Sequence, residues 1–93
     1  MIITTAVILG AIGALGVIAV LSLNRIKSWL RGRNATRTGE LIKENLANGN
    51  VEIISIGLSA SGNETARKTW TAKSLDPELA AAFGYSNRVR ITL

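Results

Sequence analysis

The sequence predicts a single-pass transmembrane α-helix followed by a small α+β domain. The predicted domain contains, in chain order, a helix, two strands, a second helix and a third strand. Its three strands form a sheet with a helix on one face. Three observations lead to this fold class: a long uncharged apolar run, two later stretches of alternating apolar residues, and one strong helix start. We divide the chain into residues 1–31, a transmembrane helix with a juxtamembrane extension; residues 32–38, a basic linker; and residues 39–93, the cytoplasmic domain.

Size and composition restrict what the chain can do. It has 93 residues, no cysteine and no histidine, and a net charge of +5 from 11 Lys+Arg against 6 Asp+Glu. No disulfide and no thiolate metal site can therefore stabilise the domain. The positive charge favours an acidic partner, an anionic membrane surface or nucleic acid.

The apolar run over residues 2–23 has no charged side chain. As a helix it would be about 33 Å long, which matches a hydrocarbon core of about 30 Å. A cleaved signal peptide and a buried soluble helix are the alternatives. Basic residues follow the run and none precedes it, so the positive-inside rule predicts an outside N-terminus and a cytoplasmic C-terminal domain.

Small residues share one side of this predicted helix. Ala6, Gly10, Gly13 and Ala14 fall within about 100° of each other on a helical wheel. Such a face lets another helix approach closely, so we expect it to bind other membrane protein subunits or a second copy of the chain. The alternative is that Gly and Ala are simply common in membrane helices.

The helix is predicted to continue past the bilayer, because Ile26 and Leu30 recur at helical spacing before Gly32. We expect this extension to contact anionic headgroups of the lipid bilayer. The predicted membrane-interface residues are Arg25, Lys27, Trp29, Arg31 and Arg33. Alternatively, these charges serve only as a topology signal.

The predicted domain begins with a short helix over residues 39–47 and continues with a hairpin. Residues 51–58 are rich in branched side chains, and residues 65–73 alternate after a short glycine-containing loop. We expect Trp70 to be the cross-strand anchor of the core.

A second helix is predicted after Asp76, which suits the N-cap, with Pro77 in the first helical position and Gly84 after the end. Residues 89–93 alternate again and predict the last strand. Because a helix precedes it, we expect this strand to lie parallel to a strand of the hairpin.

No pattern indicates chemistry. Without His or Cys there is no nucleophile–base pair, and the six carboxylates lack the spacing of a metal site. We therefore predict no catalytic residues, no cofactor and no metal, and a protein that is not an enzyme. Basic residues on the sheet form a possible partner surface: Arg67, Lys73, Arg88 and Arg90. The scarcity of aromatic residues disfavours nucleic acid as the partner.

The expected function is a non-catalytic accessory subunit or assembly factor of a larger membrane protein complex. It would dock by its transmembrane helix and bind partners with its cytoplasmic domain. The alternative is a membrane-tethered adaptor that recruits an acidic protein or nucleic acid. A third reading is a membrane-permeabilising protein of phage type.

Overall fold

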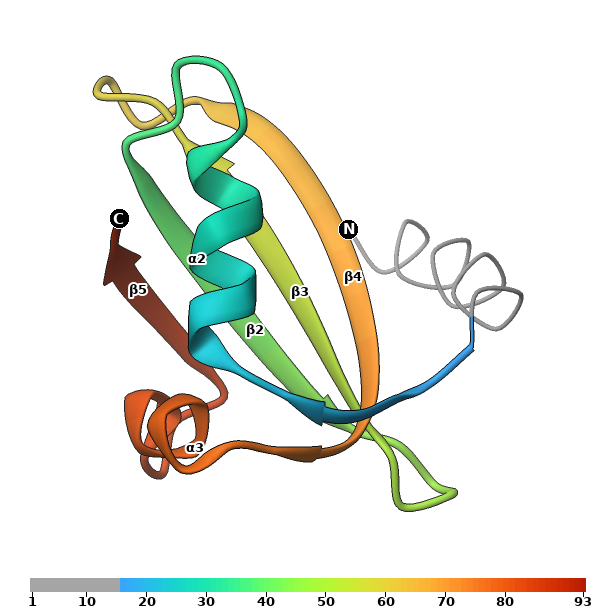
Figure 1. Cartoon of the computed structure of the whole chain (residues 1–93). Coiled ribbons are helices and arrows are strands. Elements are labelled where there is room, and N and C mark those ends of the chain that lie inside the picture. Colours follow the sequence, from blue (N-terminus) through green and yellow to red (C-terminus); the bar gives the residue numbers. More distant parts are fainter. Residues whose placement is uncertain (1–15) are drawn as a thin grey trace.

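The computed structural model describes residues 16–93, which form a curled five-stranded mixed sheet with both helices packed on one face (Figure 1). We call this the helix face and the opposite one the groove face. In chain order the elements are β1 (Ile18–Leu21), α2 (Leu23–Arg31), β2 (Thr38–Asn45), β3 (Val51–Leu58), β4 (Glu64–Leu75), α3 (Pro77–Phe83) and β5 (Arg88–Thr92).

The spatial order of the strands is β1-β4-β3-β2-β5. β2, β3 and β4 form an antiparallel meander, and β5 pairs antiparallel with β2. Gly49 and Gly62 sit in the two hairpin loops with φ of 91° and 89°, a backbone conformation that glycine adopts without steric cost. Among the strands that the structure describes, only β1 pairs in parallel, with the C-terminal end of β4.

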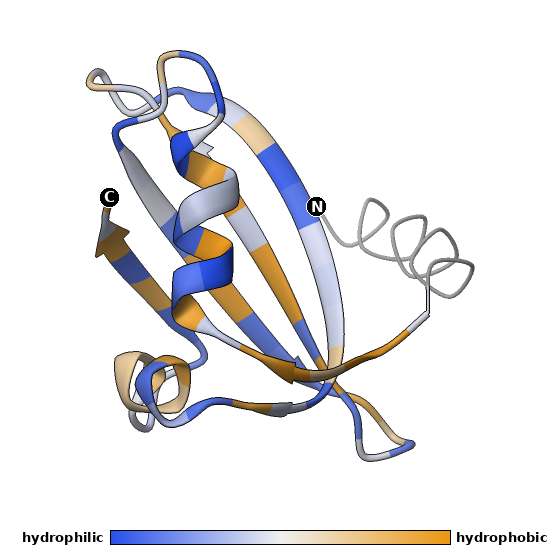
Figure 2. Cartoon of the chain, viewed as in Figure 1, coloured by the Kyte–Doolittle hydropathy of each residue, from blue (hydrophilic) through white to orange (hydrophobic). Residues whose placement is uncertain are grey.

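The helix α2 crosses the helix face and supplies much of the core. Its N-cap Ser22 accepts a hydrogen bond from the Arg25 amide at 3.1 Å, which starts the helix. Ile26 and Leu30 are fully buried, while the remaining positions are largely polar, so α2 is amphipathic (Figure 2). Gly39 of β2 lies beneath Leu30, so its lack of a side chain lets α2 approach the sheet.

The main core lies between the two helices and the sheet. Its buried members are Leu21, Ile26, Leu30, Leu41, Ile53, Trp70, Ala72, Leu79, Phe83 and Ile91. The prediction that Trp70 is the core anchor on β4 is confirmed, since its side chain is only 5% exposed.

Several local predictions are also confirmed. β3 and β4 form the predicted hairpin, and the last strand is present as β5. Asp76 caps α3 by accepting a hydrogen bond from the Leu79 amide at 2.8 Å, and Pro77 starts the helix. These features depend on residues close together in sequence, which is why the pattern alone identifies them.

The predicted transmembrane helix over residues 2–23 is wrong. Residues 18–21 form β1, and the fully buried Leu21 packs in the core. Among the residues that the structure describes, neither helix has the length and apolar composition needed to cross a lipid bilayer. The predicted single-pass location, with an outside N-terminus and a cytoplasmic domain, is overturned together with that helix.

The predicted fold class is wrong in three further respects. Residues 39–47, predicted to be helical, lie in and just after β2, because this segment pairs with β3 on one side and β5 on the other. The sheet has five strands instead of three, because residues 38–45 and 18–21 join it. The last strand pairs with β2 instead of with a strand of the hairpin, in an antiparallel pair, and the parallel pair is β1 with β4.

Candidate functional site

Two tryptophans and three cations, from α2, the segment directly after it and β4, form a cluster of contacting side chains. The rings of Trp29 and Trp70 meet edge to face, with centroids 6.5 Å apart. The cations lie over these rings: Arg33 is 4.7 Å from the Trp29 centroid, Lys68 is 4.7 Å from the Trp70 centroid, and Arg25 is 5.8 Å from it. Each distance is within the range of a cation–π interaction. We call these five residues the Arg–Trp cluster.

The Arg–Trp cluster belongs to a larger basic surface. Lys27 and Arg31 lie on the flank of α2 opposite Arg25, because successive residues of a helix are rotated by about 100°. Within residues 16–93, the ion pairs closer than 4.0 Å join Arg67 with Glu64 and Arg88 with Glu40. No cation of α2 or of the Arg–Trp cluster is neutralised by either pair.

Acidic residues are concentrated elsewhere. Four of the six acids line or adjoin the groove face, and the other two start α3. They are Glu40, Glu44, Glu52, Glu64, Asp76 and Glu78. The strongly positive net charge of the chain is therefore displayed mainly on the helix side, which attracts anionic partners.

A hollow of about 180 Å³ adjoins the Arg–Trp cluster, beside β4 and at the beginning of β1. Two of the residues around it are basic and none is acidic. Its lining consists of Gly16, Ile18, Arg25, Lys68, Thr69, Trp70 and Thr71. An anionic group placed in this hollow would lie close to two uncompensated cations.

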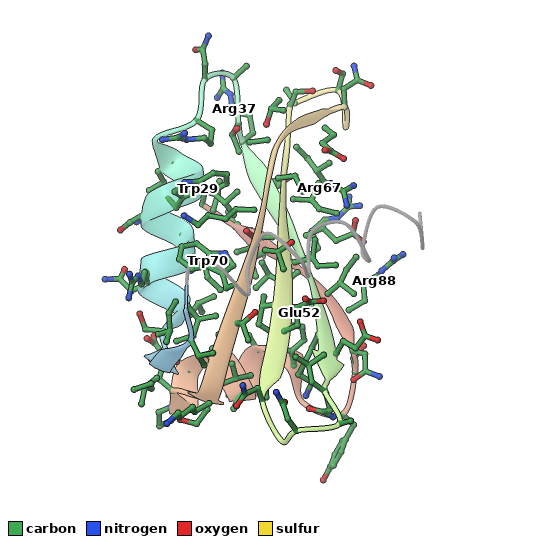
Figure 3. The ribbon with its side chains drawn as sticks, turned by 90° about the vertical axis from the view of Figure 1, so that its right-hand side faces the viewer. Trp29, Arg37, Glu52, Arg67, Trp70 and Arg88 are labelled. Carbon is green, nitrogen blue, oxygen red and sulfur yellow. The ribbon has the colours of Figure 1, made fainter. Side chains whose placement is uncertain are left out.

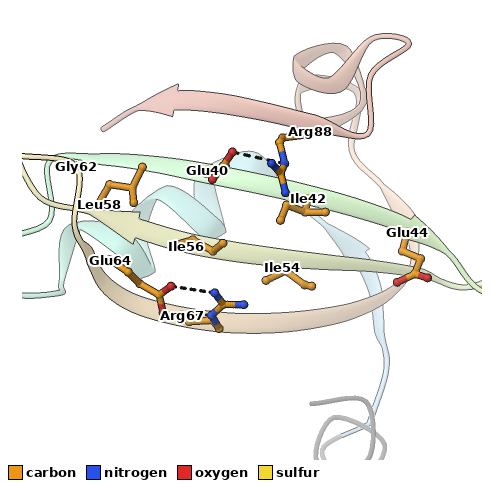
Figure 4. Close-up of a pocket in the computed structure, with 10 residues that line it drawn as sticks. All are labelled: Glu40, Ile42, Glu44, Ile54, Ile56, Leu58, Gly62, Glu64, Arg67 and Arg88. Atoms are coloured by element: carbon orange, nitrogen blue, oxygen red, sulfur yellow. Dashed lines mark hydrogen bonds and ion pairs between the residues drawn. The ribbon is translucent and has the colours of Figure 1, made fainter. Parts of the chain in front are cut away.

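A second, larger groove of about 420 Å³ runs over the groove face (Figure 4). Its apolar floor comprises Ile42, Ile54, Ile56 and Leu58. Two ion pairs flank it: Arg67 with Glu64 at 2.8 Å, and Arg88 with Glu40 at 3.5 Å. Hydrogen bonds from Arg67 lower the pKa of Glu64. The lining of this groove therefore has three glutamates and two arginines around an apolar strip.

A buried carboxylate lies next to this groove. Glu52 lies on β3 and is 0% exposed (Figure 3). It is the register partner of Glu44 on β2. Neither of its oxygens, nor the hydroxyl of Thr69, has a hydrogen-bond partner among the described residues. Burial, and to a lesser degree the charge of Glu44, raise the pKa of Glu52.

The structure places the predicted site residues in three groups. The helix-docking residues Ala6, Gly10, Gly13 and Ala14 lie outside the described residues. The predicted membrane-interface residues Arg25, Lys27, Trp29, Arg31 and Arg33 lie on α2 or directly after it. Of these, Trp29 meets the ring of Trp70 edge to face, with Arg33 and Lys68 over its own ring.

The predicted partner surface of Arg67, Lys73, Arg88 and Arg90 is placed on β4 and β5. Two of its arginines are paired with glutamates, and both line the groove face (Figures 3 and 4). These glutamates make the surface less basic than the helix side.

Sequence reasoning did not identify Lys68 or Glu52 as site residues. Lys68 lies two residues from Trp70 on β4, so both side chains are on the same face of the strand. This spacing could have placed Lys68 beside the Trp70 ring. Residues 16–93 contain no group of three or more His, Cys, Asp or Glu side chains able to hold a metal ion.

Comparisons of the chain with known protein families, with curated proteins and with solved structures find no match.

Proposed function

We propose that this protein is a non-catalytic adaptor that binds an acidic segment of a partner protein through the basic surface of α2 and β4. The observation that carries the proposal is a group of five cations, in and around α2, that have no carboxylate within 4.0 Å among the described residues. They are Arg25, Lys27, Arg31, Arg33 and Lys68. Such a role suits an accessory subunit or assembly factor of a larger complex.

An acidic protein suits this surface better than nucleic acid does. Proteins that bind single-stranded nucleic acid stack its bases on exposed aromatic faces. Here Trp70 is 5% exposed, and Trp29 has Arg33 and Lys68 over its ring. The rings hold the cations in place, and carboxylates can reach those cations from outside.

Binding of a labelled acidic peptide to the full chain tests this proposal. The probe is an eight-residue peptide that alternates glutamate and valine, and the measurement is fluorescence anisotropy at low and at moderate salt. We expect Arg25→Glu to weaken binding about tenfold, equivalent to about 1.4 kcal/mol. Raising the ionic strength should weaken binding of the unmodified chain, because exposed charges are screened.

Arg90→Glu is the matched control. It makes the same change in net charge at an exposed position of β5, away from α2. Equal effects of the two substitutions would overturn the assignment of the binding surface. Tighter binding of a 20-base-pair DNA duplex than of the peptide would overturn the choice of an acidic protein as the partner.

A further inference from the structure

One edge of the sheet is covered over only part of its length. β4 has twelve residues, and β1 pairs with Ala72, Ser74 and Leu75 at its C-terminal end. Among residues 16–93, no strand pairs with residues 64–71 of β4 on that side. We call these eight positions the open edge of β4.

Along the open edge, main-chain N–H and C=O groups of β4 have no strand partner among residues 16–93. The hydroxyl of Ser55 on β3 donates to the Lys68 carbonyl at 2.9 Å, so Lys68 directs its main chain toward β3. Main-chain groups alternate in direction along a strand, so those of Arg67 and Thr69 point away from β3. Their N–H and C=O groups are therefore available to an added strand.

The opposite edge of the sheet is a poorer template. β5 has five residues, and two of them are arginines whose side chains flank a potential partner. Short, charged edge strands are a common protection against added strands. The open edge of β4 is longer, and it adjoins the hollow of about 180 Å³.

Charge identifies the kind of segment that fits this edge. Side chains of an added strand alternate between the two faces of the sheet. On the helix face they would meet the hollow, where Arg25 and Lys68 have no carboxylate within 4.0 Å among the described residues. Acidic side chains at every second position would therefore all lie next to these cations.

From these observations we infer that the acidic partner segment binds as an added β-strand on the open edge of β4, in line with β1 and with its carboxylates toward Arg25 and Lys68. This inference rests on the proposed function and specifies its mode of binding. Main-chain hydrogen bonds supply the pairing, and the charged hollow supplies the specificity.

Backbone methylation of the peptide tests strand addition with the unmodified full chain. One version of the glutamate–valine peptide is N-methylated on all its valines, and the other on all its glutamates. Residues of a strand direct their N–H groups alternately to either side, so only one set faces β4. We expect methylation of that set to weaken binding at least tenfold and methylation of the other to have little effect.

The identity of the sensitive set also gives the strand direction. Sensitive valines indicate an antiparallel strand, and sensitive glutamates a parallel one. Equal effects of the two methylations, whether both or neither weaken binding, would overturn strand addition. A different outcome would overturn the proposed function: the unmethylated peptide does not bind, or Arg25→Glu does not change its binding.

Amide hydrogen exchange locates the added strand on the protein. On saturation with the unmethylated peptide, exchange of the Arg67 and Thr69 amides should slow at least tenfold. The Lys68 amide faces β3 and serves as the internal control, with little change expected. Unchanged exchange at Arg67 and Thr69 in the saturated complex would place the peptide elsewhere and overturn the inference.

Discussion

The indole N–H of Trp70 donates a hydrogen bond to the hydroxyl of Ser55, 2.9 Å away inside the core. Ser55 is itself fully buried on the neighbouring strand and donates its own proton to the Lys68 carbonyl. The buried indole N–H of Trp70 therefore has a hydrogen-bond partner without reaching solvent. The Ser55 hydroxyl pairs with both Trp70 and the Lys68 carbonyl.

Ser55→Ala should lower the free energy of unfolding by about 1–3 kcal/mol, because the indole N–H loses its partner in a buried site. Urea unfolding monitored by Trp fluorescence measures this. Trp70→Phe removes the N–H, so Ser55→Ala should cost less in that background. Equal costs in the two backgrounds would show that the hydrogen bond does not stabilise the fold.

Glu52→Gln should stabilise the protein at neutral pH. The folded-state pKa of Glu52 is raised, so the folded protein binds a proton that the unfolded chain releases more readily. Stability therefore falls as the pH rises from the ordinary glutamate pKa, about 4.3, to the raised value, and then levels off. Unfolding at pH 7 and below pH 4 measures the effect.

At neutral pH the Gln variant avoids this loss, and below pH 4 it should have no such advantage. Glu40→Gln is the control. Glu40 lies on the same face but forms an ion pair, so its substitution should not stabilise the protein. An advantage of Glu52→Gln that is the same at both pH values would contradict the role of ionisation.

Gly39→Ala should destabilise the fold by about 1–3 kcal/mol through overpacking. A Cβ at this position would lie 2.8 Å from Leu30 Cδ1 and 3.2 Å from Ile91 Cγ1, so α2 would have to move away from the sheet. Gly32→Ala, where the nearest atom is the Trp29 carbonyl oxygen at 3.4 Å, is the matched control. Thermal unfolding compares the stability of the two variants. Similar losses of stability would show that α2 can move away from the sheet without cost.

Asp76→Ala should cost about 1 kcal/mol, because the Leu79 amide at the start of α3 loses its acceptor. Asp76→Asn retains a side-chain oxygen at the N-cap and should be nearly neutral. Chemical denaturation of the two variants makes the comparison. If Asp76→Asn lowers the free energy of unfolding as much as Asp76→Ala does, the effect comes from the charge of Asp76 and not from its hydrogen bond.

Sequence patterns located part of the candidate site. They identified the basic residues of α2, such as Arg25 and Arg31, but assigned them to a membrane interface. The contact of Trp29 with Trp70 joins residues 41 positions apart, and its geometry depends on how α2 lies on the sheet. The open edge of β4 was also beyond the pattern, because it depends on how far a distant strand extends.

The sequence by itself determined the local features: the β3–β4 hairpin with its glycine turn, the cap of α3 at Asp76, and the alternation that makes Trp70 a core residue. Each depends on residues a few positions apart. Tertiary structure alone decided the state of residues 18–21 and 38–45. A helix satisfies its main-chain hydrogen bonds internally, whereas a strand takes its partners from distant segments. Residues 18–21 belong to a run with the hydropathy of a membrane helix, and they form a strand because β4 pairs with them.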